Sequence, residues 1–485
     1  MKAGLLRTTE GDDAKIEEID SELFGISRGN IDLALLCFAW ATALSVTCSL
    51  STCGPVAVQQ FDEDHDSAQA LWMYASYIIG ISFTAFISGN VFQSVGRFHG
   101  FMIGNALYLV GNAFGSWGVY VQSGPLVIVG ALFFGMGQGF ANFLRFAAAE
   151  IAEVNATGTK AEKHAIKSTA LTLVLSGGIL AAFFGPIMTS FAEYMIPSVQ
   201  YLGDFILMGI LTVTNMITLC FIRWPTKAER SDTDLERSRT ISIASTGPQR
   251  TLWDVMQSRV FIFAVLFSAS PYAIMSLVMS SVGVTMSDNY GRPLSDVAYT
   301  FTCHYLFMYL PGFVSGQFIA NYGMLTGCAI GIALNAVAMV VLFFETSTAG
   351  FIGGMGLVGM GWNFGFSSGS ILLMRASRPE EGLTSNVQAV HDFIVFFSSG
   401  AIVLIGGEVY KSFGWRNTVV FGMAMVGAYA AICLTAKVTR VTRTQRQMSV
   451  MAPSVSDFGP ILNKDTALAD DVGELLDLDD EDDIA

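Results

Sequence analysis

Twelve stretches of this chain are apolar enough, and long enough, to cross a lipid bilayer, and this feature limits the possible folds more than any other. A transmembrane helix needs about 20 apolar residues in succession, because the hydrocarbon core of a bilayer is about 30 Å thick. The stretches cover roughly residues 31–58, 68–91, 98–120, 124–149, 168–192, 200–223, 258–286, 295–319, 323–345, 349–374, 385–410 and 415–437. They are too long and too uniformly apolar for barrel strands. The sequence therefore predicts an all-α polytopic membrane protein with twelve transmembrane helices.

Two glycine patterns recur along the chain at nearly the same spacing. The glycine-rich stretch 135–140 is echoed by 359–364, which lies 224 residues later, and the pair Gly89 and Gly96 recurs 227 residues later. This repetition predicts two pseudo-symmetric six-helix bundles. Small residues let transmembrane helices approach one another closely, so we assign these glycines to helix packing. The packing glycines are Gly135, Gly137, Gly139, Gly359 and Gly361.

Basic residues set the orientation of a membrane protein, because Lys and Arg concentrate on the cytosolic side. If both termini are cytosolic, only Arg292, Lys411 and Arg416 of the 26 basic residues fall outside. The expected domains are a cytosolic N-terminal tail (1–30), an N-terminal bundle (31–224), a polar cytosolic linker (225–257), a C-terminal bundle (258–438) and an acidic cytosolic tail (439–485). The sequence leaves open whether the membrane is the plasma membrane or an internal one.

Soluble and enzymatic functions find little support in the chain. With 52% hydrophobic and 14% charged residues, the composition is not that of a soluble globular protein. No metal-ligand spacing, nucleotide loop or nucleophile–base set is present. We therefore expect no enzyme activity, no cofactor, no metal and no nucleic-acid partner.

Polar residues interrupt the fourth apolar stretch. On a helix, Gln138, Asn142 and Arg145 would form one polar stripe. A charge on a membrane helix is costly and by default faces a bundle interior or a watery cavity. By periodicity Glu150 cannot be the neighbour of Arg145, so its partner must come from another helix. A gating role and a structural ion pair both remain open for Arg145.

A second polar stripe begins the eleventh stretch, where Gln388, His391, Asp392 and Ser399 share one helical face. Asp392 is about two turns into the helix, where desolvation favours proton uptake, and His391 beside it can share that proton. The alternative is a fixed ion pair of Asp392 with Arg97 or Arg145 at the cytosolic rim.

Trp362 with Asn363, and His304, can each be interpreted either as functional residues or as packing residues. Trp362 and Asn363 lie at about mid-depth of a glycine-rich helix, where they suit stacking on, and hydrogen bonding to, a planar polar small molecule. Glycine-rich packing around a satisfied Trp is the competing interpretation. His304 is a lone histidine, and we interpret it as a satisfied core residue rather than a proton relay.

Twelve helices in two repeated halves, joined by a polar linker, resemble the major facilitator superfamily (MFS). The loop with Gly89, Gly96 and Arg97 is similar to the family's signature loop between helices 2 and 3, but Gln93 stands where the family usually has aspartate. Residues 30–438 are more closely similar to bacterial-type, drug-transporter-like members, a set that includes a riboflavin permease. The residues that carry this likeness are 145–150, 165–168, 177–186, 359–364, 388–396 and 414–415.

Together these features predict a monomeric secondary active transporter that works by alternating access. A small organic solute would bind between the halves at Gln138, Asn142, Trp362 and Asn363. Protons would drive transport through Asp392 and His391, with Arg145 and Gln388 in coupling or gating roles. A nutrient or vitamin-like substrate is favoured; a drug/metabolite:H⁺ antiporter and a non-transporting sensor of the same fold are the alternatives.

Overall fold

The computed structural model of the protein describes residues 22–23, 26–61, 67–155, 160–192, 194–225, 251–376 and 384–451. Two residue pairs, β1 (Glu22–Leu23) and β2 (Ile26–Ser27), form a minimal antiparallel ladder. Every other regular element in these ranges is helical. By length and composition alone, eight of the described segments qualify as membrane spans.

The helices of the N-terminal half are α2 (Arg28–Phe61), α3 (Ser67–Tyr120), α4 (Gly124–Ala141), α5 (Leu144–Asn155), α6 (Lys160–Ala192) and α7 (Leu202–Cys220). Those of the C-terminal half are α9 (Leu252–Gln257), α10 (Arg259–Val284), the π-turn η1 (Thr285–Asn289), α11 (Leu294–Tyr309), α12 (Gly312–Tyr322), α13 (Met324–Phe344), α14 (Thr348–Ala376) and α15 (Thr384–Met451). The short α9 lies within the stretch assigned to the linker, and α15 continues into the stretch assigned to the C-terminal tail.

Twelve bundle segments result when the sharp bends are counted. The helices α3 and α15 each reverse direction at one glycine, Gly96 and Gly414, and so supply two segments each. The pairs α4–α5 and α11–α12 each form one interrupted segment. The all-α prediction with twelve helices is confirmed.

The glycine of the signature loop is required by its backbone. Gly96 has φ 84° and ψ 168°, and its repeat mate Gly323 has φ 88° and ψ 155°. This region of φ/ψ space is essentially reserved for glycine. Gly89 and Gly316 differ from them, because a Cβ added at either position would meet no atom within 4 Å. Close helix approach therefore does not explain Gly89 in this conformation.

Equivalent backbone contacts in the two halves bear out the duplication. A Cβ added at Gly135 would overlap the carbonyl oxygen of Tyr77, and one at Gly359 would lie 2.5 Å from that of His304. These partners, Tyr77 and His304, are 227 residues apart. The next glycine of each motif repeats the relation, since Gly137 packs on the Gly104 carbonyl and Gly361 on that of Gly331. These close contacts are the ones expected of glycines that pack helices together, the role predicted for this motif.

The fourth segment differs from its prediction as one helix over 124–149. The helix α4 ends at Ala141, where the Asn142 amide donates to the carbonyls of both Gln138 and Phe140. The Phe143 amide then bonds the Phe140 carbonyl, three residues back, so the chain tightens into a turn before α5 begins. Arg145 therefore belongs to a separate helix and does not continue the stripe of Gln138 and Asn142.

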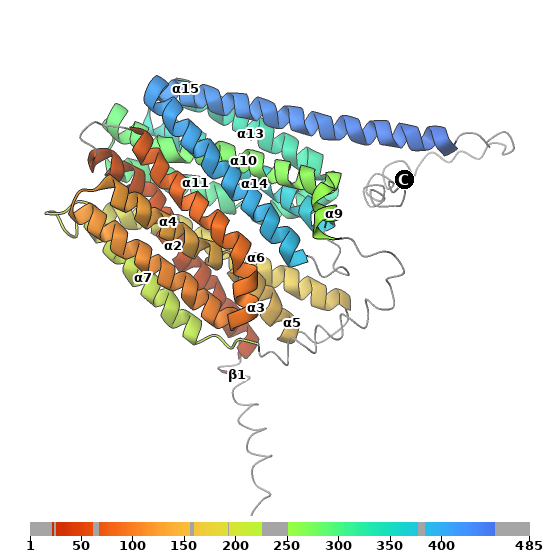
Figure 1. Ribbon diagram of the computed structural model, residues 1–485, viewed down its shortest axis with the longest axis horizontal. Coiled ribbons are helices and arrows are strands. Elements are labelled where there is room, and N and C mark those ends of the chain that lie inside the picture. Colours follow the sequence, from red (N-terminus) through yellow and green to blue (C-terminus); the bar gives the residue numbers. More distant parts are fainter. Residues whose placement is uncertain are drawn as a thin grey trace, which may run out of the picture.

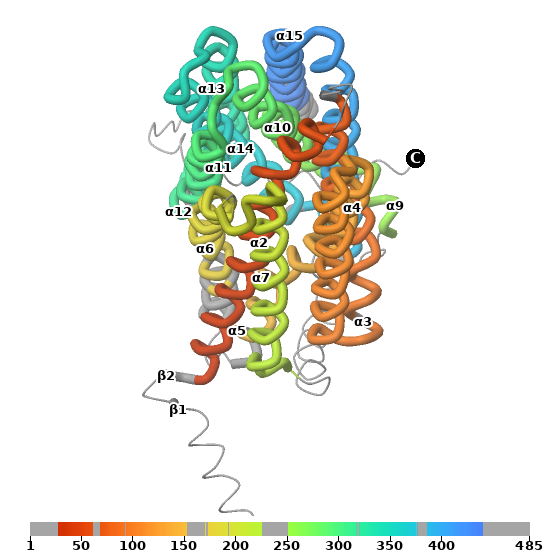
Figure 2. The backbone as a smooth tube through the Cα atoms, turned by 90° about the vertical axis from the view of Figure 1, so that its left-hand side faces the viewer, coloured from red at the N-terminus to blue at the C-terminus, as the bar shows by residue number. Residues whose placement is uncertain are grey.

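The two halves meet along two seams. The first seam packs α3 against α15, and the second packs α6 against α11. Figure 1 shows the first seam, where α3 lies beside the initial part of α15. At this seam a Cβ on Gly400 would lie 2.8 Å from Ile79, and at the second seam one on Gly178 would lie 2.9 Å from the Tyr309 ring. Figure 2 shows the halves from the side, with α7 of the N-terminal half facing the viewer in the lower part and α13 of the C-terminal half in the upper part.

Candidate functional site

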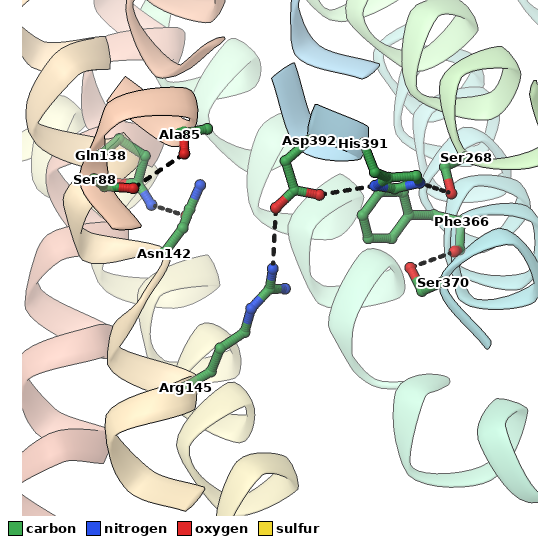
Figure 3. A network of polar contacts seen from close by, with 10 residues as sticks. All are labelled: Ala85, Ser88, Gln138, Asn142, Arg145, Ser268, Phe366, Ser370, His391 and Asp392. Carbon is green, nitrogen blue, oxygen red and sulfur yellow. Dashed lines mark hydrogen bonds and ion pairs between the residues drawn. The ribbon is translucent and has the colours of Figure 1, made fainter. Parts of the chain in front are cut away.

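An ion pair joins the two halves beside the first seam, near the start of α15. Arg145, at the start of α5, reaches Asp392 in α15 with 3.7 Å between Nη2 and Oδ2. The other carboxylate oxygen of Asp392 lies 2.9 Å from Nδ1 of His391, whose Nε2 lies 3.1 Å from Oγ of Ser268 in α10. Figure 3 shows this chain of contacts running from Arg145 through Asp392 and His391 to Ser268. We call Arg145, His391 and Asp392 the charge cluster.

The environment of the charge cluster is largely but not wholly dry. The side chains of Arg145 and Asp392 are 22% and 13% exposed, and that of His391 is 1% exposed. The Arg145 guanidinium also lies over the Phe146 ring, 4.8 Å from its centroid. In such surroundings opposite charges attract strongly, but each pays a desolvation cost. An unpaired charge on either side would therefore be unfavourable.

Arg97 of the signature loop has a different partner. Its guanidinium forms a bidentate pair with Glu150 at the end of the fourth segment, with Nε 3.0 Å from Oε2. Of the two arginines expected as rim partners for Asp392, Arg145 is thus the one that contacts it. The Arg97–Glu150 pair stays within the N-terminal half and ties the loop to α5. The side chain of Gln93 lies outside the described residues.

An amide cluster lies on the N-terminal side of the interface and consists of Thr47, Tyr108, Gln138 and Asn142. Oε1 of buried Gln138 accepts from the hydroxyls of Tyr108, at 2.5 Å, and Thr47, at 2.8 Å. Its Nε2 donates to Oδ1 of Asn142 at 2.8 Å. Three hydrogen bonds therefore orient the Gln138 amide, and Asn142 is held by its carbonyl oxygen. Figure 3 places this pair across from Asp392.

An aromatic cluster lies on the C-terminal side and consists of Tyr272, Trp362, Phe366 and Phe396. The Trp362 and Phe366 rings stack with centroids 4.9 Å apart and an interplanar angle of 11°. Tyr272 meets Trp362 edge-on at 5.9 Å and Phe396 edge-on at 5.0 Å. Trp362 occupies the repeat position of Gln138, so the duplicated site is amide-rich in one half and aromatic in the other.

The remaining predicted site residues occupy separate places. Nδ2 of Asn363 donates to the Met308 carbonyl at 2.9 Å, so this side chain joins α14 to α11 rather than the aromatic cluster. His304 is fully buried with Nδ1 2.8 Å from the Met355 carbonyl, but its Nε2 has no hydrogen-bond partner among the described residues, so the expected satisfied core histidine is found for one ring nitrogen only. Gln388 is half-buried, one turn before Asp392 in α15.

Several members of these clusters did not emerge from the sequence. Ser268 is 123 residues from His391, and no pattern in the chain links the two. Thr47 and Tyr108 likewise reach Gln138 from other helices. The pairing of Trp362 with Phe366 did have a signal, because residues four apart share one helical face. Aligning the repeats would also have matched Trp362 with Gln138.

Comparisons with known proteins agree with this architecture. A family model described as Major Facilitator Superfamily matches residues 35–387. The riboflavin transporter RfnT of Brucella anthropi is 25% identical over 339 residues, which cover 70% of this chain and 79% of that protein. The uncharacterized MFS-type transporter YddS of Bacillus subtilis is 26% identical over 347 residues, 69% of this chain and 75% of the relative.

Two solved structures share the fold at low sequence identity. The D-xylose-proton symporter superposes with a TM-score of 0.60 at 14% identity, covering 83% of this chain and 95% of that one. The human organic anion transporter MFSD10 superposes with a TM-score of 0.57 at 12% identity, covering 84% and 99%. The family model spans most of the bundle that carries the repeated glycine contacts and the inter-half ion pair. The chain belongs to the Major Facilitator Superfamily.

Proposed function

We propose that this membrane transporter moves a small organic solute by proton-coupled alternating access, as a monomer with both termini in the cytosol. The observation that carries the proposal is the ion pair between Arg145 and Asp392. It joins the two halves, and one of its members is a carboxylate that also contacts a histidine. A single proton on Asp392 would therefore alter both the charge of the site and the contact between the halves.

The proposed cycle follows from the charges. Ionised Asp392 holds Arg145, so the halves stay together at this level of the seam. Protonation of Asp392 removes the negative charge, weakens the attraction to Arg145 and lets the halves rock apart. His391 shares a carboxylate oxygen of Asp392 and can pass the proton on. In the proposed cycle Gln388, one turn before Asp392, has a gating role.

The two unlike clusters favour a planar substrate with a polar edge. Aromatic rings stack on flat apolar faces, and the oriented amides of Gln138 and Asn142 suit a heterocycle that carries carbonyl and N–H groups. Trp362 would supply the stacking surface. Asn363 would contribute only if the contact between α14 and α11 opens. The riboflavin transporter among the relatives supports a vitamin-like compound, and riboflavin is a suitable probe.

Riboflavin is expected to raise the apparent melting temperature of the purified protein, because a ligand that binds only the folded state stabilises it. In the Trp362→Phe variant, binding followed by flavin fluorescence should weaken by about two- to tenfold, since phenylalanine offers a smaller stacking surface and an aromatic contact contributes about 0.5–1.5 kcal/mol. Trp117→Phe is the matched control, because Trp117 is 58% exposed and lies away from the clusters; its affinity should stay unchanged.

Other outcomes would redirect the assignment. Stabilisation by lipophilic drugs but not by riboflavin or related vitamins would favour the antiporter alternative. Binding without any uptake into proteoliposomes would favour the sensor. Equal loss of affinity in Trp362→Phe and Trp117→Phe would contradict the placement of the substrate at the aromatic cluster.

A further inference from the structure

Ser268 contacts the charge cluster although nothing in the proposed cycle yet uses it. Its hydroxyl lies 3.1 Å from Nε2 of His391, and both side chains are almost completely buried. Gly369 of α14 packs directly on Ser268: a Cβ added there would overlap the Ser268 hydroxyl and lie 2.9 Å from the Ala264 carbonyl. The hydroxyl is therefore confined between α10, α14 and the imidazole ring (Figure 3).

The groups on either side of His391 determine which of its two ring nitrogens carries a hydrogen. In the state of the cycle in which Asp392 is ionised and pairs with Arg145, its carboxylate can only accept. Nδ1 of His391 must then carry a hydrogen. A neutral imidazole has one N–H, so Nε2 is a bare acceptor and Ser268 donates to it. When the ring gains a second proton, Nε2 becomes a donor and the Ser268 oxygen accepts, with its own hydrogen free to turn toward the Ala264 carbonyl.

Resting on the proposed function, we infer that Ser268 is a positioning residue that equips His391 to hold the transported proton. A hydroxyl can donate to the neutral ring and accept from the charged one, so Nε2 is satisfied in both states. Hydrogen bonds to charged groups are stronger than those between neutral groups. Ser268 therefore stabilises the imidazolium more than the neutral ring, and it keeps Nδ1–H directed at Asp392.

Other charged and titratable groups face the same place. Asp392 lies on the helix of His391, and Arg145 approaches from α5. Tyr272 of α10 interacts electrostatically with Asp392, and Tyr309 of α11 with Arg145. At its contact with Ser268, α14 contributes Gly369, which carries no charge. These groups are unchanged when Ser268 is replaced. A shift in the midpoint of His391 protonation in that variant can therefore be assigned to the lost hydroxyl.

The Ser268→Ala variant is expected to move the midpoint of His391 protonation to more acid pH, by about half a unit to one unit for the loss of one charge-assisted bond. The midpoint is read from the ¹⁵N resonances of His391 in the purified full-length protein, identified among five histidines by their loss in His391→Asn. The pH profile of proton-driven uptake should shift in the same direction. Ser268→Cys, with a weaker hydrogen-bonding group, should shift less.

Ser270→Ala is the matched control. Its hydroxyl donates to the Leu266 carbonyl of its own helix and is not part of the charge cluster, so neither profile should move. An unchanged or more alkaline midpoint in Ser268→Ala would overturn the role of Ser268, whatever the transport result. If the midpoint shifts as expected but uptake proves independent of any proton gradient, the effect of Ser268 on His391 protonation stands, whereas the proposed coupling and the transport role of this proton fail.

Discussion

Replacing Asp392 with asparagine is expected to abolish gradient-driven uptake while sparing counterflow exchange. Asparagine cannot take up or release the proton, so the solute can no longer be accumulated against its gradient. Exchange of labelled for unlabelled solute needs no net proton movement and should continue. We expect driven uptake to fall about 100-fold, because no carboxylate is left at this position to carry the proton, and exchange to stay within about threefold; the 100-fold loss corresponds to about 2.7 kcal/mol.

The ion pair explains why Asp392 is more sensitive than other carboxylates. In Asp392→Asn, Arg145 loses the counter-charge 3.7 Å away and remains in a site where it is only 22% exposed. The contact between halves weakens, and the equilibrium shifts toward the state in which they separate at this seam. The proposed proton-binding group and the ion pair between the halves are therefore lost together.

Transport in proteoliposomes with an imposed pH gradient measures both quantities on the same preparation. Glu408→Gln is the matched control, because Glu408 is an exposed carboxylate on the same helix α15 but lies outside the charge cluster. It should retain driven uptake. Intact driven uptake in Asp392→Asn would show that the coupling proton binds elsewhere, and equal loss of uptake and exchange would indicate a structural role for the pair.

Adding a single methyl group at Gly135 or Gly359 is expected to destabilise the folded protein strongly. In Gly135→Ala the new Cβ would overlap the Tyr77 carbonyl, and in Gly359→Ala it would lie 2.5 Å from the His304 carbonyl. Both obstacles are backbone atoms of a neighbouring helix, which cannot rotate away. Overpacking costs about 1–3 kcal/mol or more. The apparent melting temperature in detergent should fall by several degrees, more for Gly135→Ala.

Gly353→Ala serves as the control for both substitutions. It lies in the same helix as Gly359, but an added Cβ meets no atom within 4 Å. Alanine also favours a helix over glycine by about 1 kcal/mol, so this variant should melt at or above the temperature of the unchanged protein. Equal melting temperatures for all three variants would contradict the close helix contacts in the two halves.

Most of the fold could be predicted from the sequence, because long apolar runs identify transmembrane helices directly. Apolar length gives the spans, and the repeated glycines of 135–140 and 359–364 give the duplication. The break between α4 and α5 was missed, because Asn142 and Phe143 are compatible with a helix and only the switch to tighter backbone bonds ends it. Gly96 and Gly323 lie at boundaries of the predicted spans, and their positive φ angles are a backbone property that the glycine pattern did not reveal.

The site was less predictable, because its contacts join residues far apart in the chain. Periodicity put Gln388, His391 and Asp392 on one face, but it could not choose between Arg97 and Arg145 as the partner. In the structure Arg97 pairs with Glu150, so Arg145 is the arginine that contacts Asp392. Asn363 was grouped with Trp362 by sequence proximity, yet adjacent residues on a helix point about 100° apart, and Asn363 turns to α11. The roles assigned to these residues stay predictions until transport is measured.

Uptake of riboflavin by purified protein in proteoliposomes tests most directly whether the two halves form a proton-driven carrier. With an imposed pH gradient we expect saturable accumulation above that of protein-free liposomes, which collapses when a protonophore dissipates the gradient. Uptake no greater than in protein-free liposomes, for riboflavin and for every other compound that stabilises the protein, would contradict a carrier.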